Sequence, residues 1–113
     1  MGAYSVVLIT VPTQKAGDTI ARELVERRLA ACVSSVPGVR SCYRWKGKIE
    51  TAQERLLIAK TRSSLVGKLS ECARALHPYS VPEVIALPIE RGHRPYLDWI
   101  GASTPLAKAE RTR

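Results

Sequence analysis

The sequence predicts an α+β protein of the ferredoxin-like class, in which a four-stranded antiparallel sheet carries two helices on one face. Three observations predict this class. Strand-like and helix-like segments follow one another in the order β-α-β-β-α-β, a tight turn joins the second and third strands, and a short helix follows the last strand. Two β-α-β halves joined by a hairpin form this split fold. With 113 residues, 45% hydrophobic and 25% charged, the chain has the size and composition of one globular domain.

The first strand and the first helix follow directly from the start of the sequence. Residues 4–11 (YSVVLITV) are a mostly β-branched apolar run, which is typical of a central strand covered on at least one face. Pro12 ends this run, and Thr13 is expected to cap the helix that follows. From Ala16 to Leu29 apolar side chains recur every three or four residues, which predicts a helix with one buried face.

The next segment predicts two unusually long strands. Residues 39–61 contain both strands, which are joined by a turn at Lys46-Gly47-Lys48, where Gly readily takes a positive φ. The incoming strand starts near Ala31 and should kink at Pro37-Gly38, because Pro cannot donate to a strand ladder. Arms of about ten residues exceed the usual five or six. Part of the hairpin should therefore extend beyond its own sheet and offer free backbone groups to another chain.

The second helix and the last strand complete the sheet. Ser63 or Ser64 opens the helix, which should stop at His77 because the residue before Pro78 avoids the helical region. A loop then leads into a final strand over residues 84–89.

A short third helix is expected from about Pro95, which suits the first helical position, to Gly101. We therefore assign residues 1–102 to a single ferredoxin-like domain and residues 103–113 to a polar C-terminal tail. With two helices on one face, the other sheet face would be bare and partly apolar, which is a second reason to expect a partner.

The charge of the chain describes its surface but specifies no partner. Lys and Arg number 18 against 10 Asp and Glu, which gives a net charge of +8 spread along the sequence. RNA-recognition modules share this topology but stack bases on aromatic residues of the two central strands. Here those strands read VVLITV and ERLLIAKT, and the sequence contains no Phe. We expect no specific nucleic-acid partner.

The enzyme classes that this topology suggests lack their motifs. An acylphosphatase-like site needs an Arg in a Gly-rich first loop and an Asn that positions water, whereas the first loop here is PTQK and the chain has no Asn. The Gly-rich nucleotide-binding motifs are absent. His77 and His93 have no recognisable nucleophile motif beside them. The motifs therefore support no enzymatic function, although residues distant in the sequence could still converge in the fold.

Cysteine usage and hydropathy indicate the compartment. Cys32, Cys42 and Cys72 are odd in number and form no CxxC pair, which argues against a disulfide framework and a structural zinc site. All three lie in periodic apolar stretches, where we expect buried thiols. No apolar run approaches the ~20 residues of a transmembrane helix, and residues 1–4 lack a basic signal-peptide region. We expect a cytoplasmic protein without a membrane partner.

Polar and aromatic residues from separate segments are expected to meet at a subunit boundary. Lys60 ends the third strand, while Tyr79 and Glu83 belong to the loop before the fourth. Trp45 and Lys48 on the hairpin would complete a small cleft with an apolar wall and a few polar groups. The alternative is structural: Lys60 and Glu83 form an ion pair, and Trp45 packs in an interface.

A metal site is the second candidate. Imidazole and thiol ligands suit copper or zinc, and His77 is the candidate ligand. Cys72 lies five residues earlier and does not share a helical face with it. The alternative is that His77 satisfies the end of the second helix.

Five motifs together resemble the CutA divalent-cation-tolerance family over about residues 6–100. They are residues 29–33 (LAACV), 43–50 (YRWKGKIE), 60–61 (KT), 77–88 (HPYSVPEVIALP) and 96–100 (YLDWI). The resemblance implies a homotrimer built through the long hairpins and similar in architecture to the PII signalling proteins. It also implies a role in tolerance to copper and other divalent cations, with no established catalytic activity.

The family's residues carry over unevenly. Bacterial members proposed to bind copper have a Cys before the Thr of the first strand and a His-His pair before Pro-Tyr. This chain has Ile9 and Leu76-His77 there, so only His77 matches. Trp45, Lys60, Tyr79 and Glu83 all stand in matching motifs, and Tyr43 and Trp45 are expected in the trimer interface.

Three functions stay open from the sequence. The first is a trimer that senses or buffers a divalent metal of the copper class by weak binding. The second is a PII-like signalling module that binds a small anion or metabolite in the intersubunit cleft. The third is an assembly platform for a protein partner that the sequence does not identify.

Overall fold

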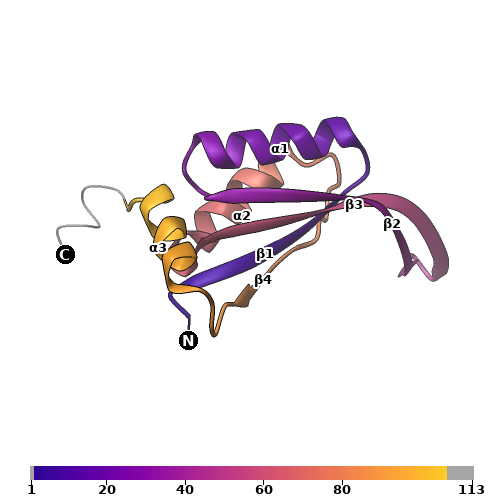
Figure 1. Ribbon diagram of the computed structural model, residues 1–113. Coiled ribbons are helices and arrows are strands. Elements are labelled where there is room, and N and C mark those ends of the chain that lie inside the picture. The colour runs from indigo at the N-terminus through magenta and orange to yellow at the C-terminus, as the bar shows by residue number, and fades with distance from the viewer. Residues whose placement is uncertain (1, 107–113) are drawn as a thin grey trace.

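The computed structural model describes residues 2–106, which form a four-stranded sheet and three α-helices. The elements in chain order are β1 (Tyr4–Val11), α1 (Gln14–Glu26), β2 (Cys32–Trp45), β3 (Lys48–Arg62), α2 (Val66–Leu76), β4 (Val84–Pro88) and α3 (Arg94–Ser103) (Figure 1). The sheet order is β2-β3-β1-β4, with antiparallel pairing throughout. The predicted α+β class, the element order and the central position of β1 and β3 are confirmed.

The core lies between the sheet and the helices α1 and α2, which cover the same face (Figure 1). Alternate residues of β1 are buried toward these helices, as expected for a strand with one covered face. Helix and strand side chains interlock there, among them Ile9, Val11, Ile20, Leu24, Leu57 and Leu69. Within residues 2–106 no helix has the length and the apolar character needed to cross a membrane.

The predicted N-cap of α1 and the predicted end of α2 are confirmed. Thr13 Oγ1 accepts a hydrogen bond from the backbone N–H of Ala16 at 3.1 Å. Helical structure resumes with a 3-10 turn at Ser63–Leu65, which continues into α2. His77 is extended, with ψ at 137°, and ends α2 before Pro78.

The end of α1 differs from the prediction. The helix stops at Glu26, although the apolar spacing continues to Leu29. Arg28 takes a left-handed φ of 58°, and the N–H groups of Leu29 and Ala30 both donate to the Leu24 carbonyl. Leu29 therefore packs on the core from a turn instead of a helix.

β2 and β3 form the predicted long hairpin, with strands of 14 and 15 residues. Lys46 and Gly47 make its turn with φ values of 51° and 78°, the left-handed geometry of a tight two-residue hairpin loop. The predicted kink at residues 37–38 is a bulge, where the pairing register shifts between Val36 and Val39.

The hairpin also extends beyond the rest of the sheet, as predicted. β1 pairs with β3 only from Arg55 to Arg62, so residues 48–54 of β3 pair with β2 alone. The molecule measures 49 Å along its long axis against 27 and 24 Å across. The overhanging hairpin curls away at the end of the molecule opposite α3 (Figure 1).

The sheet face opposite α1 and α2, which we call the open face, is only partly covered. Ile85 and Leu87 of β4 point to this face and remain 52% and 48% exposed. At one end α3 packs against the sheet, where the Arg62 side chain donates to the carbonyls of Gly101 and Thr104 at 2.7 and 2.6 Å. A bare, partly apolar face was expected from the sequence, and the structure confirms it over β4.

The helix α3 runs past its predicted end at Gly101. It continues to Ser103, and the fully buried Thr104 donates from Oγ1 to the Ile100 carbonyl at 2.7 Å. A Cβ on Gly101 would lie 2.6 Å from the Tyr4 hydroxyl, so this glycine permits close packing and does not end the helix. The predicted tail thus starts with packed residues, and its positions 107–113 lie outside the described residues.

Candidate functional site

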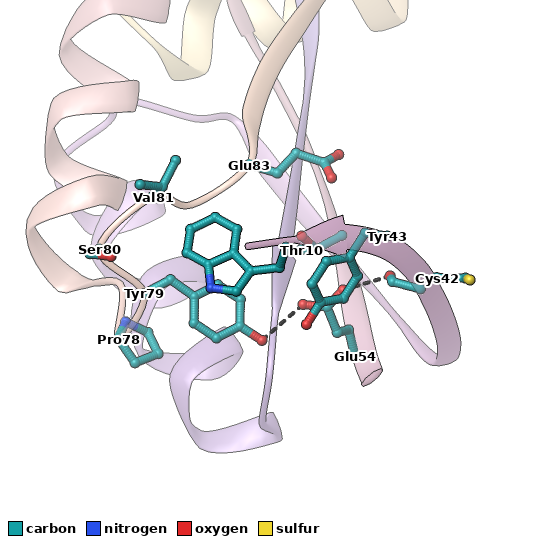
Figure 2. A pocket seen from close by; sticks show the side chains of 11 residues that line it. Thr10, Cys42, Tyr43, Glu54, Pro78, Tyr79, Ser80, Val81 and Glu83 are labelled. Atoms are coloured by element: carbon teal, nitrogen blue, oxygen red, sulfur yellow. Dashed lines mark hydrogen bonds between the residues drawn. The ribbon is translucent and has the colours of Figure 1, made fainter. Parts of the chain in front are cut away.

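A groove of about 820 Å³ lies at the root of the hairpin, where β2 and β3 leave the sheet and the loop between α2 and β4 passes beside them (Figure 2). We call it the hairpin groove. Its walls come from the end of β1, the hairpin and the loop, and the lining residues are Thr10, Ser41, Cys42, Tyr43, Trp45, Glu54, Pro78, Tyr79, Ser80, Val81 and Glu83.

A buried carboxylate, Glu54, is the centre of the polar network in the groove. Its side chain is only 8% exposed because it sits where the hairpin leaves the sheet. Ser41 donates from Oγ to Oε1 at 2.6 Å, and the Tyr79 hydroxyl donates to Oε2 at 3.0 Å (Figure 2). None of the ion pairs among residues 2–106 includes Glu54. Two neutral hydroxyls therefore hold this negative charge.

Tyr79 is kept in its protonated form by this arrangement. Burial of the ring raises the pKa of Tyr79 to about 12, and the hydrogen bond to Glu54 and its negative charge add to the effect. The phenol therefore remains a hydrogen-bond donor to Glu54 throughout the neutral pH range.

His77 fixes the loop against the sheet. Its Nδ1 accepts from the backbone N–H of Tyr79 at 3.1 Å, so Nε2 carries the ring proton and donates to the Thr10 carbonyl at 2.7 Å. The ring is 8% exposed and lies 4.9 Å, between centroids, from the ring of Tyr79. The ring is thus a bridge between loop and strand, and at the end of α2 it is the backbone N–H of His77 that donates to the Arg74 carbonyl, at 3.4 Å.

The residues at His77 do not fit a metal ion. Both ring nitrogens are already engaged, and a metal ligand needs a free lone pair on one of them. Cys72 is buried between helix and sheet, where burial raises the pKa of its thiol, and Cys42 is exposed on the hairpin instead of buried as predicted. Across residues 2–106 no three His, Cys, Asp or Glu side chains gather as a metal would require.

The structure brings together most of the predicted cleft residues. Trp45, Tyr79 and Glu83 line the hairpin groove with Tyr43, although they come from β2 and from the loop before β4. Figure 2 shows Glu83 well apart from Glu54 along the groove.

The two predicted lysines do not join them within the chain. Lys60 lies on the open face, where its Nζ donates to Ser34 Oγ at 2.9 Å and approaches Cys32 Sγ at 3.9 Å. The considered ion pair between Lys60 and Glu83 is not formed. Lys48 lies across the hairpin from Trp45 and is exposed beyond the groove.

Sequence reasoning missed Glu54, Ser41 and Thr10. A signal for Glu54 existed, because it alternates with Leu56 and Ile58 and therefore points to the open face of β3. A carboxylate on that face, beside an apolar strand, stands out from the surrounding pattern. Nothing in the sequence indicated that a tyrosine from a distant loop would cover it.

The groove has the opposite charge to the rest of the molecule. Among residues 2–106, the charged side chains that line the groove are those of Glu54 and Glu83, and no Lys or Arg joins them. The chain as a whole carries 18 basic and 10 acidic residues. The groove is thus an acidic, aromatic-walled site on a basic protein.

Comparison with known proteins places this architecture in a family. A family model described as "CutA1 divalent ion tolerance protein" matches residues 5–103. The chain belongs to this CutA1 family. The divalent-cation tolerance protein CutA of Thermus thermophilus is 56% identical over 99 residues, which cover 88% of this chain and 96% of that protein. Protein CutA of Mus musculus is 52% identical over 99 residues, 88% of this chain but only 56% of the mouse protein.

Solved CutA1 structures agree with the fold. The Thermus thermophilus Cut A1 structure has a TM-score of 0.88 at 54% identity and covers 90% of this chain and 99% of that one. The CutA1 structure from Oryza sativa has a TM-score of 0.90 at 48% identity, with 94% and 97% covered. The family resemblance drawn from the five motifs is confirmed.

Proposed function

We propose that this CutA1-family chain works as a cytoplasmic, non-enzymatic homotrimer in the cell's tolerance of divalent metal ions. The divalent-cation role follows from the family to which the chain belongs. The proposal assigns the chain no catalytic step. Its three free cysteines are compatible with a reducing compartment.

The trimer is the part of the proposal that the geometry supports best, and the overhanging hairpin is the observation that carries it. Residues 48–54 of β3 pair only with β2, and Tyr43 and Trp45 on this ribbon remain 44% and 46% exposed. A two-stranded hairpin is marginally stable alone in water, so a partner that covers these rings would stabilise it. Each large side chain removed from water contributes about 2 kcal/mol. A trimer similar to the PII proteins would cover the ribbon and the open face together.

Metal binding at His77 is not part of this proposal. Copper or another divalent cation would have to displace the Thr10 or Tyr79 hydrogen bond of the ring. We infer that any tolerance role operates through assembly or through a ligand other than a metal held by His77.

Sedimentation and growth measurements test the two halves of the proposal. The purified chain should sediment at micromolar concentration with three times the mass of one subunit. In a host that lacks its own CutA-family protein, expression should raise the copper concentration that halves growth. A stable monomer would contradict the assembly, and unchanged copper sensitivity would contradict the tolerance role.

A second function, a signalling module of the PII type, is favoured by one observation: the hairpin groove itself. Its volume of about 820 Å³ is in the range of small-molecule sites. The lining carboxylates favour a cationic or neutral metabolite over the anion that the chain's positive charge suggests. A thermal-shift screen tests this, and stabilisation by organic anions alone would contradict our reading of the groove.

A further inference from the structure

Strand β3 carries two opposite charges, Glu54 and Lys60, that the ion pairs within residues 2–106 leave out. The Glu54 side chain is 8% exposed and accepts hydrogen bonds from two hydroxyls. The Lys60 ammonium is half-buried on the open face, donates to Ser34 Oγ at 2.9 Å and lies 3.9 Å from Cys32 Sγ. Each charge is therefore held by groups that do not carry the opposite charge.

The two charges cannot neutralise each other inside one subunit. Side chains alternate along a strand, and Glu54 and Lys60 are separated by an even number of positions, so they point to the same side of β3. Six positions at about 3.4 Å each place them about 20 Å apart. Leu56 and Ile58 stand between them on that side as half-buried apolar residues.

Covering the open face would take both groups out of water. Lys60 lies on this face between Val6 of β1 and Cys32 of β2, its partners in the two strand ladders. Glu54 is already buried at the root of the overhanging hairpin. A charge buried without a partner is costly, so a trimer that buries this face needs an anion at Lys60 and a cation at Glu54. One ion pair between subunits meets both needs.

A ring of identical subunits allows such a pair. Each contact in the ring joins one surface of a subunit to a different surface of the next, so a side chain need not face its own copy. The overhanging hairpin is one such surface and has Glu54 at its root. The open face with Lys60 is the other. The same pair would then recur at every contact of the ring.

Other charged side chains suit this contact less well. On the open-face side of β3, in the part that pairs with β1, the other basic residue is Arg62, whose side chain already donates to two backbone carbonyls at the end of α3. Lys48 is exposed near the hairpin turn, where water solvates its charge. Glu83 is exposed as well, so it needs a cation less than the buried Glu54 does.

We propose that the partner subunit's Lys60 pairs with Glu54 at each contact of the homotrimer. This pairing rests on the assembly proposed above and goes beyond it, because it names the two residues that complete the buried site across the subunit boundary. An ionised carboxylate offers about four lone-pair positions, and the hydroxyls of Ser41 and Tyr79 use two of them. The incoming ammonium donates to the remaining positions.

A double-mutant cycle tests the pairing through the strength of assembly. Glu54→Gln and Lys60→Met each remove one charge with little change in shape and leave the other charge buried alone. Each should raise the protein concentration at which half of the trimer dissociates by at least about tenfold, measured by sedimentation at one fixed urea concentration. Both changes together should cost no more than the larger single change, because no unpaired charge is left. Two effects that simply multiply would overturn the pairing.

Matched controls locate the partner of each charge. Lys48→Met removes an exposed lysine from the same strand, and its effect should multiply with that of Glu54→Gln. Glu83→Gln removes an exposed acid, and its effect should multiply with that of Lys60→Met. Coupling of Glu54 to Lys48, or of Lys60 to Glu83, would overturn the assignment.

Folding and assembly are kept separate from the pairing. Circular dichroism shows whether each variant is folded, and Glu54→Asp replaces Glu54→Gln if the latter does not fold. Glu54→Asp draws the charge back by one methylene, so it should weaken assembly in the unchanged background and have little effect beside Lys60→Met; an equal effect in both backgrounds would refute the pairing. An unchanged chain that sediments as a monomer would contradict the proposed function itself. A stable trimer in which the two changes act independently would refute only this pair.

Discussion

At the scale of single residues, the Tyr79 hydroxyl joins the loop to the hairpin through Glu54. Because no basic side chain among residues 2–106 pairs with Glu54, this hydrogen bond has two consequences. It compensates for burial of the carboxylate, and it makes the phenol harder to ionise. Both consequences depend on the same proton.

Stability at high pH should therefore depend on Tyr79. The pKa of Tyr79 is about 12 in the folded chain and has its ordinary value of 10.0 when unfolded, so the unfolded chain releases the proton first as pH rises. The contribution is fully present below pH 10 and is lost between pH 10 and 12. Tyr79→Phe should lower the free energy of unfolding by about 1 kcal/mol at neutral pH. Above pH 10 the free energy of unfolding of this variant should decrease less steeply with pH than that of the unchanged chain. Urea unfolding across this range measures it, and equally steep curves for both proteins would contradict the assignment.

The residues of the groove were predictable only in part. Trp45, Tyr79 and Glu83 stand in local motifs whose proximity follows from the fold. Within one subunit Lys60 lies away from the groove, because strand register pairs it with Cys32 of β2 and points it to the open face beside Ser34. Its place in a cleft between subunits stays a prediction. Glu54 was missed because its burial depends on a tyrosine 25 residues away, a contact that no local pattern contains.

At the scale of the elements, caps and turns decide where each segment ends. Thr13→Ala should lower the free energy of unfolding by about 1 kcal/mol, because the Ala16 N–H loses its acceptor. Thr19→Ala is the matched control: Thr19 is exposed in the middle of α1, where alanine is the better helix former, so stability should stay equal or rise by a few tenths of a kcal/mol. Urea unfolding at one fixed protein concentration compares the two. Equal losses would show that the Thr13 hydroxyl does not act as a cap.

Element boundaries show how far local signals reach. The start of α1 and the end of α2 follow from Thr13 and Pro78, whose effects act within a few residues. The ends of α1 and α3 were placed wrongly because tertiary contacts decide them. Arg28 takes a left-handed conformation so that the chain can turn into β2, and Gly101 lies against Tyr4, which lets α3 continue to Ser103.

At the scale of the whole molecule, the open face and the outer side of α1 both expose apolar side chains, but we expect a trimer to cover only the open face. Leu87 on the open face and Val25 on α1 are exposed to similar extents, 48% and 43%. If a trimer covers the open face, Leu87 becomes buried and Val25 does not. Burial of Leu87 would then contribute roughly 1.5–3 kcal/mol per subunit to the free energy of association.

Leu87→Asp should therefore dissociate the trimer, because it would bury an unpaired carboxylate in the interface. Val25→Asp, the same change on the helix side, should leave the assembly intact. Sedimentation velocity at micromolar concentration distinguishes them. A trimer that survives Leu87→Asp, or one that both changes dissociate, would place the interface elsewhere.

The hairpin that outreaches its sheet has a consequence for backbone dynamics. The backbone of residues 39–54 pairs only within the hairpin, whereas β1 pairs with a strand on both sides. Amide hydrogens in the overhang are then protected by the stability of an isolated ribbon, which is small, and those of β1 by the unfolding of the whole domain. If subunits cover the ribbon, its exchange with solvent slows as protein concentration rises, while exchange in β1 responds far less. Hydrogen exchange would then report two separate processes in one chain. Slow exchange in β1 would report unfolding of the domain, and faster exchange in the overhang would report the association of subunits.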